Sequence, residues 1–352
     1  MSEKFNGVRI EFHILQSFPV SCLNRDDLGS PKSAIIGGVP RARVSSQCWK
    51  RAVRMEMHEL GVHTASRTKY IVRTIAEKCI AKGASEEQAN QCGEWTANAF
   101  TKTVKDGISD TLFFISDSEA EGIAAAFAQN SFTEIKEKEL QKICKAALNP
   151  AHDGLDIALF GRMVANAADM NVEAAASFAH AISTHRVDPE IDFFTAVDDC
   201  KAEDESGSAH MGSLEFNSAT YYRYVSLDLG QLAENLKNDG IIPAVEAFTR
   251  ALFLAVPAAR QTTMSAANPW NYAIVTVRKG QRMQLPFNTA VRTSAKEPDM
   301  VENSIVALQK KFADAERMYG SLFGLKSKTE ISLESGSVDE LTDNLKNALA
   351  TL

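Results

Sequence analysis

The N-terminal segment alternates apolar and polar side chains with a period of two. The even positions are apolar and the odd positions between them are polar, in the order Val8, Arg9, Ile10, Glu11, Phe12, His13 and Ile14. Because successive side chains of a β-strand point to opposite faces, this pattern predicts a strand over residues 8–15. A β-strand is therefore expected to open the fold.

A long basic loop is expected after this strand. Glycine and proline at positions 29, 31, 37, 38 and 40 interrupt regular structure, so residues 19–44 are predicted to form a loop. Loops of this length in compact domains are usually functional. The loop and the segment behind it are also rich in arginine and lysine, which makes them the first candidates for a binding surface.

A helix capped by Ser45 or Ser46 is predicted over residues 47–60. Its buried stripe is expected to consist of Trp49, Val53, Met57 and Leu60. On another, exposed face lie Gln47, Lys50 and Arg54, spaced i, i+3 and i+7. Three long polar donors in a row can follow a phosphate backbone.

The remaining segments predict an α+β protein with a helical insertion. Residues 68–148 look helical, with breaks near Gly83, Gly107 and Gly122, and the last helix is expected over 133–148. Behind it we predict a strand (155–160), a helix (172–182), a strand (221–229), a helix (240–254) and a strand (273–278). This βαββαβ-like order favours a ferredoxin-like core, and the polar excursion between 191 and 216 is interpreted as a projecting hairpin.

Charge is segregated along the chain. The net charge is −7, yet residues 28–55 carry six Lys and Arg and no acid, for a local charge of +6. Residues 186–206 carry eight acids against two bases, for a local charge of −6. A basic surface for a polyanion and an acidic surface that meets a neighbouring copy would explain this asymmetry. Two solvated faces without a partner would explain it equally simply.

Several classes of protein are disfavoured by the sequence. The longest apolar run, 251–259, has nine residues and includes Pro257, whereas a membrane-spanning helix needs about 20. The N-terminus has no apolar signal region, and the six cysteines are scattered without a CxxC pair. We therefore expect a cytoplasmic protein with reduced thiols and no membrane partner.

Enzymatic signatures are missing. We find no P-loop, no dinucleotide fingerprint and no nucleophile elbow. His180 and His185 are five residues apart, which does not place two ligands on one helix face, so both are interpreted as polar residues near the core. Asp26 and Asp27 can hold a divalent cation for phosphodiester hydrolysis, but we favour a role in orienting Arg25 and capping the loop. No catalytic residue, metal or cofactor is expected.

Four ordered blocks of sequence resemble the backbone subunit of the type I-E CRISPR Cascade complex, the CasC family. The first block is Ser21–Asp27 with Gly37–Gly38, Arg43–Gln47 and Lys50–Ala52, and the second is Asp156–Met163. The third is Ala179–His185 with Val187–Asp188 and Ile191–Asp199, and the fourth is Gly207–Gly212 with Glu215–Phe216 and Tyr222–Tyr224. The blocks span the chain to about residue 290, beyond which the resemblance thins.

The resemblance implies a right-hand-like molecule that binds guide RNA. It consists of an RNA-recognition-motif-like palm, a helical fingers domain and a thumb hairpin. The implied boundaries are 1–67, 149–190 and 219–352 for the palm and C-terminal helices, 68–148 for the fingers, and 191–218 for the thumb. Several copies would stack along one CRISPR RNA (crRNA) as a helical filament, next to large, small, CasD-type and CasE-type subunits, and would present its bases to target DNA without catalysis.

The resemblance also assigns residues to these roles. The residues expected to hold the crRNA backbone are Arg25, Lys32, Arg41, Arg43, Ser46, Gln47, Lys50 and Arg54, with Arg260 and Arg292 as weaker candidates. The resemblance implies that Met163 is the apolar side chain that packs on a displaced base. The thumb residues expected to stack on bases or form its core are Phe193, Phe194 and His210. The residues expected to face target DNA are Lys138, Lys142 and Lys145.

Two further hypotheses remain open. A metal-dependent endonuclease that uses Asp26 or Asp27, as in type III backbone subunits, would cut complementary RNA at regular intervals. A general single-strand-binding protein would show no preference for CRISPR repeat-flanked RNA and would not co-purify with other subunits.

Overall fold

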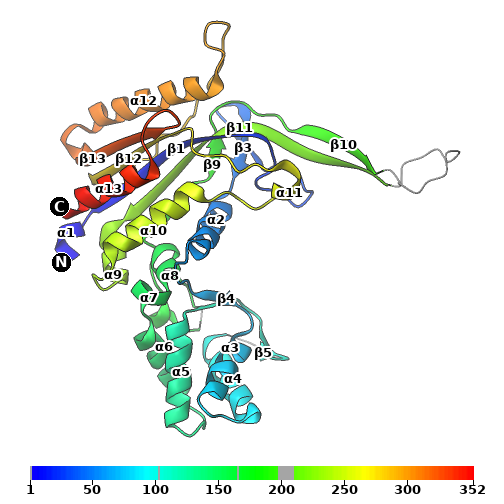
Figure 1. The fold of residues 1–352 in the computed structure, drawn as a ribbon, viewed down its shortest axis with the longest axis vertical. Coiled ribbons are helices and arrows are strands. Elements are labelled where there is room, and N and C mark those ends of the chain that lie inside the picture. The colour runs from blue at the N-terminus through cyan, green and yellow to red at the C-terminus, as the bar shows by residue number, and fades with distance from the viewer. Residues whose placement is uncertain (1, 102–103, 165, 197–209) are drawn as a thin grey trace, which may run out of the picture.

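A nine-stranded antiparallel sheet forms the centre of the computed structural model, which describes residues 2–101, 104–164, 166–196 and 210–352 (Figure 1). The longest path through the sheet runs in the order β13 (Leu325–Ser332), β12 (Tyr272–Lys279), β1 (Val8–Ser21), β11 (His210–Asp228), β9 (Ala181–Ser183), β3 (Val39–Val44) and β2 (Ser33–Ile36). Two further strands, β8 (Ala176–Phe178) and β10 (Glu190–Ala196), pair with β11. The sheet therefore joins segments from both ends of the chain.

Strand β1 lies inside the sheet, where it pairs with β11 and β12 and is buried along most of its length. Phe12 stands opposite Val225 of β11 and Val275 of β12. The side chains of Val8, Ile10, Phe12 and Ile14 join a core with α2 (Ser46–Glu59), α9 (Leu229–Asn235), α10 (Ile241–Leu254) and α13 (Val338–Ala350). In chain order, β1, α2, β9, β11, α10 and β12 follow a βαββαβ order, in which β9 takes the place of the strand expected at 155–160.

The opposite face of the sheet is covered by α12 (Met300–Tyr319) and an extended segment at 283–287. Apolar side chains such as Leu308 and Phe312 fill this layer together with several buried polar groups. Glu11 pairs with Arg278 and accepts a hydrogen bond from Tyr224, while His13 lies 2.9 Å from the Tyr222 hydroxyl. Burial, and next the Arg278 cation, lower the pKa of His13 to about 3. Protein side chains therefore occupy the centre of this face of the sheet.

A helical domain is inserted between α2 and β8 and hangs below the sheet in Figure 1. It contains α3 (Ile71–Ala81), α4 (Glu86–Phe100), α5 (Asp117–Gln129) and α6 (Glu137–Ala147), with the short strands β4 (Ser66–Thr68), β5 (Val104–Lys105), β6 (Ile108–Ser109) and β7 (Phe113–Ile115). Its buried cluster extends from Ile71 to Met170, beyond the expected end of the domain at residue 148. Two short helices, α7 (Pro150–Asp153) and α8 (Leu155–Phe160), lead back toward the sheet.

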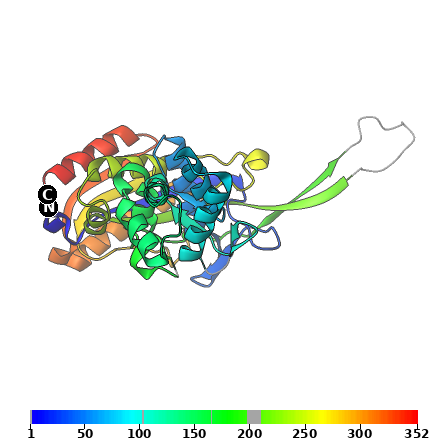
Figure 2. The ribbon, with the colours of Figure 1, turned by 90° about the horizontal axis from the view of Figure 1, so that it is seen from below.

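A two-stranded hairpin projects from the body of the molecule, as Figure 2 shows most clearly. It is formed by β10 and the first part of β11, with Glu190 opposite Phe216 and Ala196 opposite His210. The described residues therefore include the paired strands at the base of the expected hairpin. Four short elements complete the description, namely α1 (Ser2–Phe5), η1 (Ala168–Met170), α11 (Gln261–Met264) and η2 (Gly320–Phe323). Within the described part, no helix is long and apolar enough to cross a bilayer.

Most of the predicted elements are confirmed, and several are wrong. The strands at 8–15, 221–229 and 273–278 and the helices at 47–60 and 240–254 are present, although β1 and β11 are longer than expected. Residues 155–160 form a helix instead of a strand, and 172–182 contain β8 and β9 instead of a helix. The segment 19–44 is not one loop, because β2 and β3 form a hairpin across Gly37 and Gly38. Gly122 lies inside α5 and does not break a helix. Leu60, which was expected in the buried stripe, caps the end of α2 at the surface.

Candidate nucleic-acid interface

A basic cluster lies at the edge of the sheet where β3 leads into α2. The backbone carbonyl of Lys32 accepts a hydrogen bond from Arg43 N at 2.8 Å, which holds the two residues side by side. The Arg43 guanidinium donates to Ser33 O and lies 3.3 Å from Nδ1 of His180. Burial, and then the cations of Arg43 and Lys32, lower the pKa of His180. His180 is exposed on this cluster, so its interpretation as a residue near the core is wrong.

Lys50 extends this cluster along α2. Its ammonium lies 5.9 Å from the centre of the Phe178 ring on β8. Burial lowers the pKa of the Lys50 ammonium, which means that the charged form is desolvated there. A phosphate close to Lys50 would offset this penalty. We call Lys32, Arg43 and Lys50 the basic track.

The N-terminus of α2 begins beside the track. Ser45 is the N-cap, as expected, since its hydroxyl accepts from Cys48 N at 3.3 Å, and Asn24 Oδ1 accepts from Ser45 N. Ser46 and Gln47 occupy the first turn, and the Gln47 side chain is exposed. Amides of the first turn have no intrahelical acceptor, so they and the helix dipole favour an anion here.

Arg25 and Arg260, which are far apart in the sequence, come together around Cys22. Burial raises the pKa of the Cys22 thiol, while the cations of Arg260 and Arg25 oppose this shift. Arg260 has a left-handed backbone with a φ of 57° and precedes α11. The structure thus places both arginines near the base of the projecting hairpin, where Glu215 also acts on the same thiol.

Arg41 does not belong to the surface, which corrects its expected role. Its side chain is fully buried. The guanidinium donates to Ser183 O at 2.5 Å and to Phe287 O at 2.8 Å. The segment around Phe287 covers the β2–β3 hairpin, so Arg41 satisfies carbonyl groups inside the protein and has no free donor for a phosphate at the surface.

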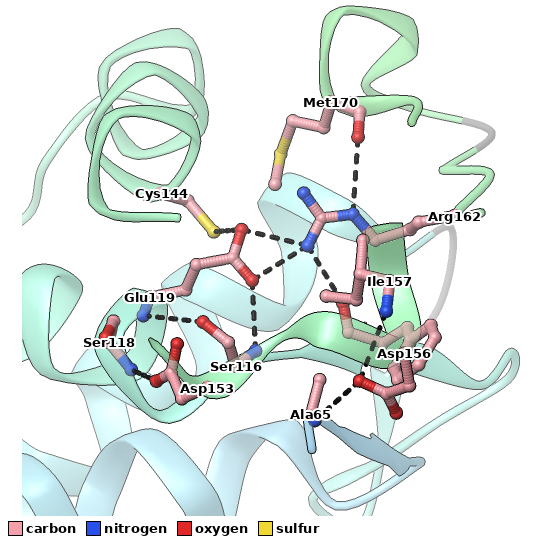
Figure 3. A network of polar contacts seen from close by, with 11 residues as sticks. Ala65, Ser116, Ser118, Glu119, Cys144, Asp153, Asp156, Ile157, Arg162 and Met170 are labelled. Atoms are coloured by element: carbon pink, nitrogen blue, oxygen red, sulfur yellow. Dashed lines mark hydrogen bonds and ion pairs between the residues drawn. The ribbon is translucent and has the colours of Figure 1, made fainter. Parts of the chain in front are cut away.

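Arg54 is also engaged within the protein. Its Nε donates to Asp156 Oδ2 at 2.6 Å, and its Nη2 donates to Ala65 O. Asp156 in turn accepts from Ala65 N at 2.9 Å, and burial raises the pKa of its carboxyl group (Figure 3). The ion pair joins α2 to α8, so Arg54 first stabilises the junction between sheet and helical domain. Its side chain is still 23% exposed.

Met163 projects into solvent from a rigid turn. It is 85% exposed, whereas Arg162 beside it is buried. The Arg162 guanidinium donates from Nη1 to both oxygens of Glu119 at 2.8 Å and from Nε to Met170 O (Figure 3). Glu119 forms a capping box with Ser116 at the start of α5. Two buried charges therefore fix the backbone from which Met163 extends.

The two phenylalanines of the projecting hairpin have different surroundings. Phe193 is 64% exposed, and Phe194, the next residue along the strand, is 38% exposed. The ring of Phe194 lies over Gly212 on the paired strand, where an added Cβ would come within 2.5 Å of it. Phe193 points to the other face and is the better candidate for contact with a base. The side chain of the third thumb candidate, His210, lies outside the described residues.

The remaining predicted residues lie apart from the track. Lys138, Lys142 and Lys145 are exposed along α6, opposite its buried Leu140 and Cys144. Arg292 is exposed on the far face of the sheet, where it lines a cavity beside α12. The α6 lysines form a second basic surface on the helical domain, and the structure does not bring Arg292 to either surface.

Two cavities flank α2. One, of about 790 Å³, is lined by both acids and bases, including Asp26, Asp27 and Arg51. Asp26 Oδ1 accepts from Leu28 N and Ser30 N, each at 2.9 Å, so this carboxylate caps the loop. In the described part of the chain, no group of three His, Cys, Asp or Glu residues is placed to hold a metal ion.

The other cavity, of about 370 Å³, lies between α2 and β4 and is lined by Arg54, Met55, His58, Thr64, Ala65, Ser66, Arg67 and Thr68. The residue pattern had not been interpreted as a site here. His58 continues the spacing of Gln47, Lys50 and Arg54 by one further turn of the helix. This spacing is the sequence signal that could have indicated the cavity.

These features define an α+β protein with an antiparallel sheet, an inserted helical domain, a projecting hairpin and a basic track on one edge. The model of the family described as "CT1975-like protein" matches residues 10–349, so the chain belongs to this family. A search of curated proteins finds no match.

Two solved structures have the same fold. A chain of a structure described as "CRISPR RNA-guided surveillance complex, pre-nicking" has a TM-score of 0.79 and 27% identity, over 97% of this chain and 99% of that chain. A chain of a second structure, described as "CRISPR RNA-guided surveillance complex", has a TM-score of 0.68 and 22% identity, over 98% of this chain and 100% of that chain. At the lower identity the likeness shows the fold alone.

Proposed function

We propose that this protein is a crRNA-binding backbone subunit of a Cascade-type surveillance complex. The full-length likeness to a chain of an RNA-guided surveillance complex supports this function. The observation that carries the proposal is the basic track beside the N-terminus of α2. It offers charge and backbone amides, which recognise ribose-phosphate irrespective of base.

The finer assignments form part of the same proposal. The spatial order β12, β1, β11, β9 with α2 and α10 on one face supports an RRM-like, ferredoxin-like palm. The helical domain corresponds to the fingers and the β10–β11 hairpin to the thumb. We assign the protein to the type I-E (CasC) group, in the cytoplasm, as a non-catalytic subunit that forms a helical filament with further copies of itself.

In this mechanism, the protein holds the guide and the guide reads the target. Base pairing supplies sequence specificity, so the protein needs contacts to backbone and shape alone. Neutralised phosphates release counterions, which makes binding depend on salt. Copies linked along one RNA bind with an effective concentration that a single copy lacks. Met163 and Phe193 would separate or stack on guide bases, and the α6 lysines would face target DNA.

Purification from the native host followed by sequencing of the bound RNA tests the function. We expect RNA with CRISPR repeat sequence, together with the large, small, CasD-type and CasE-type subunits. RNA without such sequence and without co-purifying subunits would favour a general single-strand-binding protein. Magnesium-dependent cuts at regular intervals in complementary RNA, lost in an Asp26→Ala/Asp27→Ala variant, would favour the endonuclease.

A further inference from the structure

The cavity between α2 and β4 has the chemistry of an anion site. Its lining contains three basic residues, Arg54, His58 and Arg67, and three hydroxyl-bearing residues, Thr64, Ser66 and Thr68. None of the described residues that line it carries a carboxylate, although the chain as a whole has a net charge of −7. By contrast, the lining of the larger cavity on the other side of α2 contains acidic as well as basic residues, with Asp26, Asp27, Glu56 and Glu59 beside its arginines. The described lining of the smaller cavity is therefore basic without an acidic residue, although Arg54 is paired with Asp156 outside the lining.

Two of the basic side chains are available to a ligand. Within the described residues, neither the His58 imidazole nor the Arg67 guanidinium forms a hydrogen bond or ion pair, and both side chains are exposed. Arg67 is held at the main chain, where β4 pairs with β7 and Arg67 stands opposite Phe114. A planar guanidinium on a fixed strand can offer two parallel donors to a phosphate.

Arg54 connects this cavity to the basic track. Asp156 and Ala65 engage its Nε and Nη2, which fixes the orientation of the guanidinium. Lys50 lies one turn before Arg54 on α2, and His58 lies one turn after it. At 1.5 Å per residue, His58 is about 12 Å along the helix from Lys50. A chain of phosphates that follows α2 from the track would therefore reach the cavity.

We propose that the cavity formed by Arg54, His58 and Arg67 is a separate binding site for a phosphodiester group, at the junction between the sheet and the helical domain. The proposal rests on the proposed function, since the phosphate would belong to a nucleic acid held on the track. The chemistry fits a guide RNA phosphate or a target DNA phosphate, and the experiment separates the two sources. His58 and Arg67 bind the ligand, whereas Arg54 positions the site.

The test uses the full chain and a His58→Ala/Arg67→Ala variant. Neither side chain has a partner within the described residues, so this variant is expected to fold normally. A Lys326→Ala variant is the control, because it removes a positive charge from exposed β13 at the opposite edge of the sheet. The affinity for single-stranded RNA is measured from low to high salt, and the affinity of the RNA-loaded protein for complementary DNA is then measured in the same way.

A guide phosphate predicts that the plot of log affinity against log salt for RNA becomes less steep by about 0.7 for each phosphate that the variant no longer binds. A target phosphate predicts unchanged RNA binding and a weaker salt dependence in the DNA step. Lys326→Ala should alter neither slope. If both slopes and both affinities of the cavity variant equal those of the unaltered protein, the site does not exist. If the unaltered protein fails to bind RNA at all, the proposed function itself is wrong.

Discussion

Removal of Arg162 should destabilise the protein more than almost any other single polar substitution. The side chains of Arg162 and Glu119 are 1% and 0% exposed, and two 2.8 Å contacts join them. An Arg162→Met variant leaves the Glu119 carboxylate buried without its counter-charge. Breaking one partner of a buried ion pair costs about 3–5 kcal/mol, out of a typical total stability of about 5–15 kcal/mol.

Urea unfolding measures this effect, and a double-mutant cycle isolates the pair. The Glu119→Gln/Arg162→Met double variant removes both charges and should lose less stability than the two single variants added together. Arg73→Met is the matched control. It breaks the exposed Arg73–Glu77 pair on α3 and should leave the unfolding midpoint unchanged.

Two results would refute this reasoning. An Arg162→Met variant that loses less than about 1 kcal/mol would mean that the junction relaxes or admits water around Glu119. If the stability losses of the two single variants add up to the loss in the double variant, the two side chains act independently. In either case, the backbone that precedes Met163 would not be fixed by this pair.

Three further predictions concern particular residues. Burial holds the pKa of His13 near 3 in the folded protein, whereas the ordinary pKa of histidine is 6.5. As the pH falls below 6.5, His13 therefore gains a proton in the unfolded chain but not in the folded chain. The free energy of unfolding should therefore fall by about 2 kcal/mol between pH 7 and pH 5, and a His13→Phe variant should show a smaller fall, as urea titrations at both pH values can check. Gly37→Ala should lower the melting temperature more than Gly38→Ala, because both have a positive φ but only at Gly37 would a Cβ lie 1.9 Å from Asn288 O; equal effects would contradict the close contact. Phe193→Ala should weaken RNA-dependent assembly by between about 5-fold and 150-fold, the range for loss of one stacked base, whereas Phe194→Ala should mainly loosen the hairpin, as binding assays and proteolysis of the hairpin can distinguish.

The local sequence pattern predicted the correct secondary structure where the apolar residues of a segment repeat with one clear period. The strict alternation before residue 15 specified β1, and the capping serine with the Trp49, Val53 and Met57 stripe specified α2. The short apolar run at 155–160 has no such period, and a run of this length fits a buried strand or a buried helix. The alanine-rich segment 172–182 favours a helix locally, but pairing of Phe178 with Val225 on β11 overrides that preference.

The candidate site shows the same division between local and distant information. Charge at 28–55 located the basic surface, yet it could not separate Arg43, which reaches the surface, from Arg41, which is buried under a segment more than 240 residues away. Arg54 is similarly engaged by Asp156, which follows it by 102 residues. The hairpin of β2 and β3 was visible in principle, since a Gly-Gly pair between apolar residues is a two-residue turn signal.

The salt dependence of RNA binding by two matched triple variants tests the central claim most directly. One variant removes the track (Lys32→Ala/Arg43→Ala/Lys50→Ala), and the other removes the same charge from α6 (Lys138→Ala/Lys142→Ala/Lys145→Ala). If the track clamps ribose-phosphate, its loss should flatten the plot of log affinity against log salt by about 2, while the α6 variant should bind single-stranded RNA as the unaltered protein does. Equal slopes for both variants would contradict the claim, because general charge would then explain the binding.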